Sequence, residues 1–168
     1  MRPSAVDRQA LARRLQVYAI TDERDDLPDL LRVLAAADFL AAGAGAVLLK
    51  GGHGTAGWAD ERLSVDLLFE GRTVTALAAP RIATRNTHGT GCTYASAIAA
   101  CLALGMPLLA SVGCARAFVQ QAVERATDWH MGEGDGPLDH SAPALNRACG
   151  ALQAGESYLW DGGAWRQL

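Results

Sequence analysis

The segment at positions 87–92, Thr-His-Gly-Thr-Gly-Cys, stands directly before a long helical pattern, and its residue types suit anion chemistry. A loop that enters a helix exposes backbone N–H groups that no carbonyl inside the helix can accept, at the positive end of the helix dipole. Gly89 and Gly91 carry no Cβ, so a bulky anion can come close to this backbone. We therefore predict a phosphate site formed by Gly89, Thr90 and Gly91. The alternative is a purely structural helix entry with Thr90 as the N-cap residue.

Cys92 falls in the first turn of the expected helix, where the positive end of the dipole favours the thiolate over the thiol. A thiolate there could accept the proton of a hydroxyl group that attacks a phosphorus atom. We therefore take Cys92 as the candidate catalytic base. For Cys101, Cys114 and Cys149, a small buried apolar side chain is the better interpretation. No Cys-x-x-Cys pair occurs, so we expect neither a zinc site nor a disulfide framework.

Lys50 is the single lysine among 15 basic residues. It follows the apolar run 46–49, which is typical of a strand buried on both faces, and open α/β sheets bind their ligands at the carboxyl ends of such strands. A compact ammonium group suits a point contact to phosphate, so we predict that Lys50 binds a phosphate group. The alternative is a surface lysine whose ammonium group reaches into solvent.

Three further polar residues lie near these two segments. His53 and His88 could polarise a phosphate group, or could be loop histidines that bond to the backbone, and we give them second rank. Asp66 could orient Lys50 or be a solvated strand residue, and we leave it outside the candidate site.

The surrounding pattern predicts the elements that must position these residues. An amphipathic helix over 27–42 precedes the strand at 46–49, and an antiparallel hairpin joins 65–69 to 73–77 through a glycine turn. Two helices follow, at 92–104 and 108–129, and the tail carries a further hairpin flanked by Trp160 and Trp165. On the second helix we expect a polar face, opposite the apolar one, made of Arg116, Gln120, Glu124 and Asp128. The fold class is therefore α/β.

Composition narrows the functional classes. A chain of 168 residues with a formal net charge of −3 is long enough for one globular domain. It carries no basic stripe that would follow a nucleic acid backbone and no apolar run long enough for a bilayer. The first residues alternate charge with alanine rather than forming the apolar core of a secretion signal, so we expect a cytoplasmic protein.

Four motifs in order resemble the hydroxymethylpyrimidine/phosphomethylpyrimidine kinases of thiamine biosynthesis. They lie at 47–53, 65–68, 86–93 and 132–140. The resemblance implies part of a ribokinase-like sheet flanked by helices, with a β-hairpin, and implies ATP and Mg²⁺ as cofactors. It also implies that Cys92 is the general base, that Gly89, Thr90 and Gly91 supply an anion hole, and that Lys50 contacts the nucleotide phosphates.

The resemblance covers residues 27–140, which correspond to the C-terminal half of such a kinase. We accordingly divide the chain into an N-terminal extension (1–26), the kinase-like half (27–140) and a tail (141–168). The family's Thr-Pro-Asn-x-x-Glu segment, which is linked to its magnesium site, has no counterpart here, so we assign no metal ligand.

Three hypotheses follow. The first is an ATP-dependent kinase of hydroxymethylpyrimidine or its phosphate. The second is a non-catalytic half-domain that binds nucleotide, or that associates with itself or with another chain which completes the sheet. The third is a related pyridoxal-type kinase, since an anion hole alone does not select the acceptor.

Overall fold

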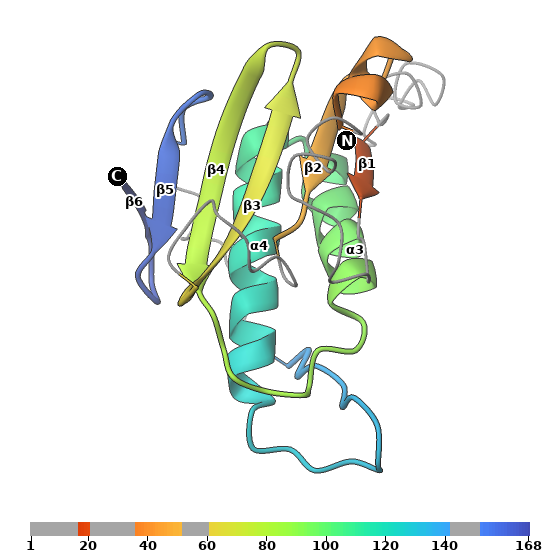
Figure 1. The fold of residues 1–168 in the computed structure, drawn as a ribbon, viewed down its shortest axis with the longest axis vertical. Coiled ribbons are helices and arrows are strands. Elements are labelled where there is room, and N and C mark those ends of the chain that lie inside the picture. Colours follow the sequence, from red (N-terminus) through yellow and green to blue (C-terminus); the bar gives the residue numbers. More distant parts are fainter. Residues whose placement is uncertain (1–16, 21–35, 52–60, 142–151) are drawn as a thin grey trace, which may run out of the picture.

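The computed structural model describes residues 17–20, 36–51, 61–141 and 152–168. Their strands form one six-stranded sheet in the order β1-β2-β3-β4-β5-β6 (Figure 1). Neighbouring strands are parallel in the pairs β1–β2 and β4–β5 and antiparallel in the others. The strand bounds are β1 Val17–Ile20, β2 Ala46–Leu49, β3 Leu63–Glu70, β4 Thr73–Pro80, β5 Ser157–Trp160 and β6 Trp165–Gln167.

Strand β2 has the bounds that its apolar run predicted, and all four of its residues are buried. Ala46 and Leu48 face the main core, whereas Val47 and Leu49 face a second core on the other side of the sheet. A short helix at 36–41 covers that second side through Ala36. This helix confirms the end of the one expected over 27–42; residues 27–35 lie outside the described residues.

The predicted hairpin is confirmed, and both of its strands are longer than expected. β3 pairs with β4 from Leu63↔Pro80 to Glu70↔Thr73. The turn uses Gly71 with φ 59°, a left-handed conformation that glycine adopts without strain. The hairpin therefore extends the sheet and carries Asp66 in its first strand.

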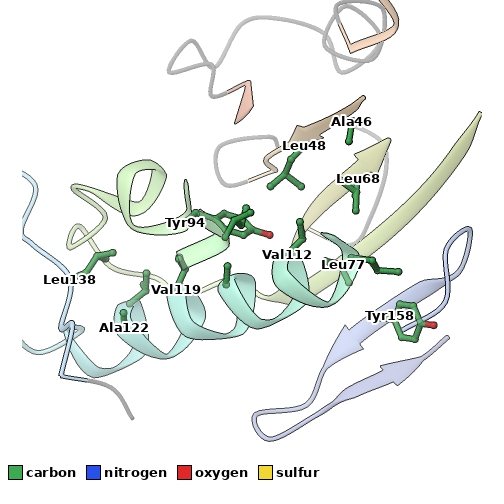
Figure 2. Close-up of a cluster of buried hydrophobic side chains, with 14 residues drawn as sticks. Ala46, Leu48, Leu68, Leu77, Tyr94, Val112, Val119, Ala122, Leu138 and Tyr158 are labelled. Atoms are coloured by element: carbon green, nitrogen blue, oxygen red, sulfur yellow. The ribbon is translucent and has the colours of Figure 1, made fainter. Parts of the chain in front are cut away.

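Helices α3 (Thr90–Ala103) and α4 (Leu108–Arg125) lie side by side behind the sheet (Figure 1). They enclose the main core with the strands, and Figure 2 shows Tyr94 of α3 among the apolar side chains that α4 and the strands contribute. The α3 helix begins two residues before the predicted start. Its N-cap is Gly89, so the N-cap prediction of Thr90 is wrong, while the choice between an anion site and a purely structural helix entry stays a prediction.

The α4 helix ends at Arg125 rather than at the predicted Trp129. After Arg125 the backbone forms shorter-range bonds, from Thr127 N–H to the Glu124 carbonyl (3.3 Å) and from Trp129 N–H to the Ala126 carbonyl (3.0 Å). Bonds between residues three apart close a tighter turn than the α-helical ladder, so the α-helix ends here. Asn86, which is buried, also donates from Nδ2 to the carbonyls of Ala126 (2.6 Å) and Trp129 (2.8 Å).

Two residues of the predicted polar face of α4 are buried. Arg116 is 5% exposed and Gln120 is 3% exposed, so the polar face that we expected to be opposite the apolar one does not exist at these positions. Both side chains bond to groups on the strands instead of to solvent, as described below.

The tail forms the predicted hairpin and continues the sheet. Asp161 N–H donates to the Ala164 carbonyl (3.1 Å) across the turn, and the rings of Trp160 and Trp165 lie 5.3 Å apart. The sheet contains strands from the predicted N-terminal extension (1–26), the kinase-like half (27–140) and the tail (141–168). The division of the chain into these three segments stays a prediction. Cys114 is disulfide-bonded, which the cysteine spacing did not predict.

Candidate functional site

The N-terminus of α3 has the geometry of an anion site. Gly89 has φ 86° and precedes the first turn, where Thr93 N–H donates to the Gly89 carbonyl (2.9 Å). The N–H groups of Gly91 and Cys92 have no acceptor inside the helix, as at any helix start. No acidic side chain lies in this turn, so the positive end of the dipole is not neutralised from within the helix.

A neighbouring loop fixes the entry to α3. The backbone N–H of His88 donates to the Gly136 carbonyl (3.1 Å), and His88 forms an isolated bridge with Pro137. A Cβ at Gly136 would lie 1.8 Å from Asn86 Oδ1, so this close approach requires glycine. The motif at 132–140 therefore supports the loop that leads into α3. His88 itself is exposed and contributes here through its backbone.

Lys50 leaves the end of β2 and lies partly buried beside α3. Its Nζ is 5.9 Å from the centroid of the Tyr94 ring, within the range of a cation–π contact. Burial lowers the pKa of Lys50, and the Arg116 guanidinium lowers it further, while Asp66 and Cys92 act in the opposite direction. The ammonium group is therefore held in a partly desolvated place, where its attraction to an anion is stronger than in water.

Asp66 is 2% exposed and lies at the centre of this region. Its Oδ1 accepts a hydrogen bond from Gly51 N–H (2.9 Å), the residue after Lys50. Its Oδ2 lies 3.0 Å from Arg116 Nε, and both side chains of this ion pair are buried. Asp66 is thus a buried, paired carboxylate rather than a solvated strand residue.

Arg116 and Gln120 complete the polar cluster from α4. Arg116 donates to the Ser64 carbonyl (3.3 Å) and to Gln120 Oε1 (3.0 Å), and Gln120 donates to the Pro80 carbonyl (2.8 Å). These contacts explain why the two residues are buried although the sequence pattern placed them on a polar face. Burial raises the pKa of the Tyr94 hydroxyl, and the Asp66 carboxylate raises it further.

A cavity of about 380 Å³ adjoins this cluster. It lies between the sheet, both helices and the segment that follows β4. Its lining includes Lys50, Asp66, Thr90, Tyr94 and Arg116. The structure thus brings the predicted phosphate residues Lys50 and Thr90 to one cavity, although they lie 40 positions apart in the sequence.

Cys92 is exposed and lines a second, more open hollow of about 410 Å³. Thr93 and His140 line the same hollow, and Thr93 Oγ1 lies 2.8 Å from His140 Nε2. Cys92 is nevertheless among the groups that raise the pKa of Lys50, so the two residues lie within electrostatic reach of each other. His53 lies outside the described residues.

Within the described ranges, no three side chains of His, Cys, Asp or Glu gather as metal ligands would. None of the helices described is both long and apolar enough to cross a bilayer.

The model of the phosphomethylpyrimidine kinase family matches residues 19–139, which is more than half of the chain. The chain belongs to this family. The resemblance drawn from the four motifs is therefore confirmed.

Relatives in the phosphomethylpyrimidine kinase family match over part of their length. A hydroxymethylpyrimidine/phosphomethylpyrimidine kinase of Rhizobium meliloti (strain 1021) is 47% identical over 98 residues, which are 58% of this chain and 35% of the relative. The enzyme of the same name from Streptomyces coelicolor is 46% identical over 126 residues, covering 74% of this chain and 43% of the relative. The chain thus spans less than half of these relatives.

Solved structures confirm the predicted ribokinase-like α/β fold. A pyridoxal kinase from Staphylococcus aureus in complex with AMP-PCP and pyridoxal has a TM-score of 0.59 at 34% identity, covering 71% of this chain and 42% of that one. An ADP complex of Bacillus subtilis pyridoxal kinase has a TM-score of 0.64 at 29% identity, covering 83% and 55%. The chain matches only part of each of these kinases, as expected for part of a ribokinase-like sheet.

Sequence reasoning missed Asp66 as a site residue, and it missed the role of Arg116. One signal was available: an aspartate inside an apolar strand motif requires a partner if it is buried. The partner itself is on a helix 50 positions later, and no local pattern identifies it.

Proposed function

We propose that the chain takes part in the ATP-dependent phosphorylation of hydroxymethylpyrimidine or its phosphate, in the cytoplasmic synthesis of thiamine. The observation that carries this proposal is the common cavity of Lys50 and Thr90 beside the open N-terminus of α3, in a member of the phosphomethylpyrimidine kinase family. A cation and free amides directed at one place are what a transferring phosphate group requires.

In this proposal Lys50 contacts the nucleotide phosphates, and the backbone amides from Gly89 to Cys92 stabilise the negative charge that develops on the γ-phosphate. Gly89 has the left-handed backbone that starts the helix at this place, and its missing Cβ leaves room for the phosphate. His53 and His88 stay second-rank candidates for contacts to the same phosphates.

Cys92 acts as the base. With hydroxymethylpyrimidine as acceptor, the hydroxymethyl oxygen forms a bond to the γ-phosphorus and its proton passes to the Cys92 thiolate; with the phosphate as acceptor, a phosphate oxygen forms that bond. The bond between the γ-phosphorus and the bridging oxygen breaks, and that oxygen leaves with ADP. The exposed position of Cys92 gives an acceptor molecule access to the sulfur.

Mg²⁺ would arrive with ATP, since a divalent cation neutralises negative charge on the β- and γ-phosphates. The steps given for Lys50, the helix amides and Cys92 are those of this chain's own residues.

A pyridoxal-type kinase is the second candidate. The solved structures named above are pyridoxal kinases, and one of them contains both AMP-PCP and pyridoxal. The residues described here bind phosphate and accept a proton, and neither action selects between a pyrimidine and a pyridine alcohol.

ADP release with hydroxymethylpyrimidine and with pyridoxal tests both candidates. We expect turnover with the pyrimidine that Cys92→Ala reduces by about 10²–10⁴-fold, the usual contribution of a general base. Greater turnover with pyridoxal would favour the second candidate, and turnover no higher than that of Cys92→Ala would contradict catalysis by this chain.

The chain spans 35% of the Rhizobium enzyme, so nucleotide binding is measured separately from turnover. Titration with AMP-PCP, combined with the protein's mass in solution, distinguishes an active kinase from a non-catalytic half-domain that binds nucleotide as a self-associated or partnered chain. Binding without turnover supports the half-domain.

A further inference from the structure

We propose that Asp66 and Arg116 are positioning residues that place the Lys50 ammonium group for nucleotide binding. This inference rests on the nucleotide site proposed above and adds the side chains that set its geometry. Neither residue is assigned a contact with the nucleotide; both act through the turn that carries Lys50.

The first step is the contact between Asp66 and that turn. Lys50 and Gly51 leave β2, whose last residue, Leu49, pairs with Leu67 of β3. The Asp66 carboxylate therefore lies level with the turn, and its Oδ1 accepts the Gly51 N–H at 2.9 Å. A hydrogen bond to a charged acceptor is stronger than one between neutral groups, so it fixes the peptide unit next to Lys50.

Gly51 makes this arrangement possible. A Cβ built on Gly51 would lie 1.9 Å from the Val65 carbonyl oxygen. Backbone atoms of a sheet strand cannot move aside cheaply, so the turn approaches β3 at a distance that only glycine permits.

The second step is the anchoring of Asp66. Arg116 faces the carboxylate with its Nε at 3.0 Å and also donates to the Ser64 carbonyl and to Gln120. Gln120 in turn donates to the Pro80 carbonyl. The guanidinium is thus tied directly to β3, and through Gln120 to β4, at the open end of the hairpin. The carboxylate cannot turn away from this pairing without leaving a buried charge unpaired.

The third step concerns the charge of Lys50. Among the described residues, four groups act on it from the elements packed around the turn: Asp66 on β3, Arg116 on α4, and Cys92 and the Tyr94 ring on α3. Asp66 is the strongest group that favours the ammonium form, and it opposes the effects of burial and of Arg116. The carboxylate therefore supports the charge of Lys50 as well as its position.

A double-mutant cycle on the full chain tests the proposal, with AMP-PCP titrated into wild type, Asp66→Asn, Lys50→Ala and the double variant. We expect Asp66→Asn to weaken binding about tenfold when Lys50 is present and less than twofold when position 50 is alanine, which is the coupling typical of residues that act together. Asp128→Asn, a change at an exposed carboxylate, serves as the matched control and should leave the affinity unchanged. Equal losses in both backgrounds would overturn the proposal.

The pH profile provides a readout that a merely structural role would not move. Because Asp66 favours the ammonium form, its loss lowers the pKa of Lys50, and the decline of AMP-PCP affinity at high pH should begin at a lower pH in Asp66→Asn than in wild type. An unchanged profile would contradict the proposal.

Asp66→Asn leaves Arg116 without its counter-charge and could prevent folding, so Gly51→Ala provides a second route. This change displaces the turn while the ion pair stays intact. We expect about a tenfold loss of affinity that again depends on Lys50; a loss that is equal in the Lys50→Ala background contradicts the proposal. If the wild type binds no AMP-PCP, both the nucleotide site and this inference are overturned. If the wild type binds AMP-PCP but the effects of the Asp66 and Lys50 changes simply add, this inference alone is overturned.

Discussion

Lys50 shows at the level of one residue how binding and stability oppose each other. Its ammonium group is partly buried, and burial is the main cause of its lowered pKa. The folded chain therefore keeps a charge in a place that disfavours it. Such a charge is retained where a function needs it, at the expense of stability.

Lys50→Met should accordingly raise the melting temperature while it weakens nucleotide binding. Burial disfavours the ammonium group in the folded chain and not in the unfolded chain, and methionine carries no charge to desolvate. We expect a rise of about 2–4 °C, the shift that roughly 1 kcal/mol produces in a chain of this size.

The pH dependence of that difference is a check on its origin. As the pH rises through the lowered pKa of Lys50 toward the ordinary value of about 10.4, the folded wild type loses the Lys50 proton before the unfolded chain does. The loss of folding stability that the buried charge causes then disappears. Melting curves of both proteins should therefore converge with rising pH. A gap that stays constant would show that the charge is not its cause.

At the level of elements, the start of α3 depends on one backbone conformation. Gly89 has φ 86°, and a Cβ there would meet nothing within 4 Å. Gly105, just after the same helix, has φ 84° and equally open surroundings. The two glycines therefore differ in their place relative to the anion site and not in strain.

Gly89→Ala and Gly105→Ala form a matched pair because each adds only the left-handed backbone penalty, about 1–2 kcal/mol. We expect similar losses in the free energy of urea unfolding for both. Only Gly89→Ala should reduce AMP-PCP affinity, since only that residue shapes the anion loop. Equal affinities for the two variants would remove Gly89 from the phosphate site.

Local patterns were sufficient for most elements and insufficient for their ends. The apolar run of β2 and the glycine turn of the hairpin depend on neighbours in sequence, and both predictions are confirmed. At the end of α4, the Ala126 carbonyl accepts a hydrogen bond from Asn86, which lies 40 positions away. No helix-stop signal within α4 contains that information.

The same distinction separates the two parts of the candidate site. Gly89, Thr90 and Gly91 form one continuous motif that can be read directly, and Lys50 was distinctive as the single lysine of the chain. Arg116 stands in a helix whose polar spacing resembles an exposed face. Its burial follows from the partner on β3, which only the assembled fold brings near.

At the level of the whole molecule, the tail strands β5 and β6 form one edge of the sheet and pack against α4. Trp160 is 1% exposed and packs with Ala79 of β4 and Ala117 of α4. Trp165 donates from Nε1 to the Gly113 carbonyl of the same helix (3.1 Å). Strands β5 and β6 are thus packed into the core rather than appended to it.

Trp160→Ala should cost about 3–5 kcal/mol, the usual loss for a buried large aromatic residue. Trp129→Ala is the control, because Trp129 is 40% exposed and should cost much less. Urea unfolding followed by circular dichroism measures both. A Trp160→Ala protein as stable as the control would show that the tail packs independently of the sheet.

The bond from Arg116 to the Ser64 carbonyl joins residues 52 positions apart, and this has a consequence for the order of assembly during translation. A growing chain has made β2, the Lys50 turn and the hairpin long before α4 leaves the ribosome. Contacts between segments so distant in sequence form late, after the local elements. The turn therefore takes its binding geometry only when α4 docks, and a nascent chain that ends before Arg116 should be unable to retain nucleotide.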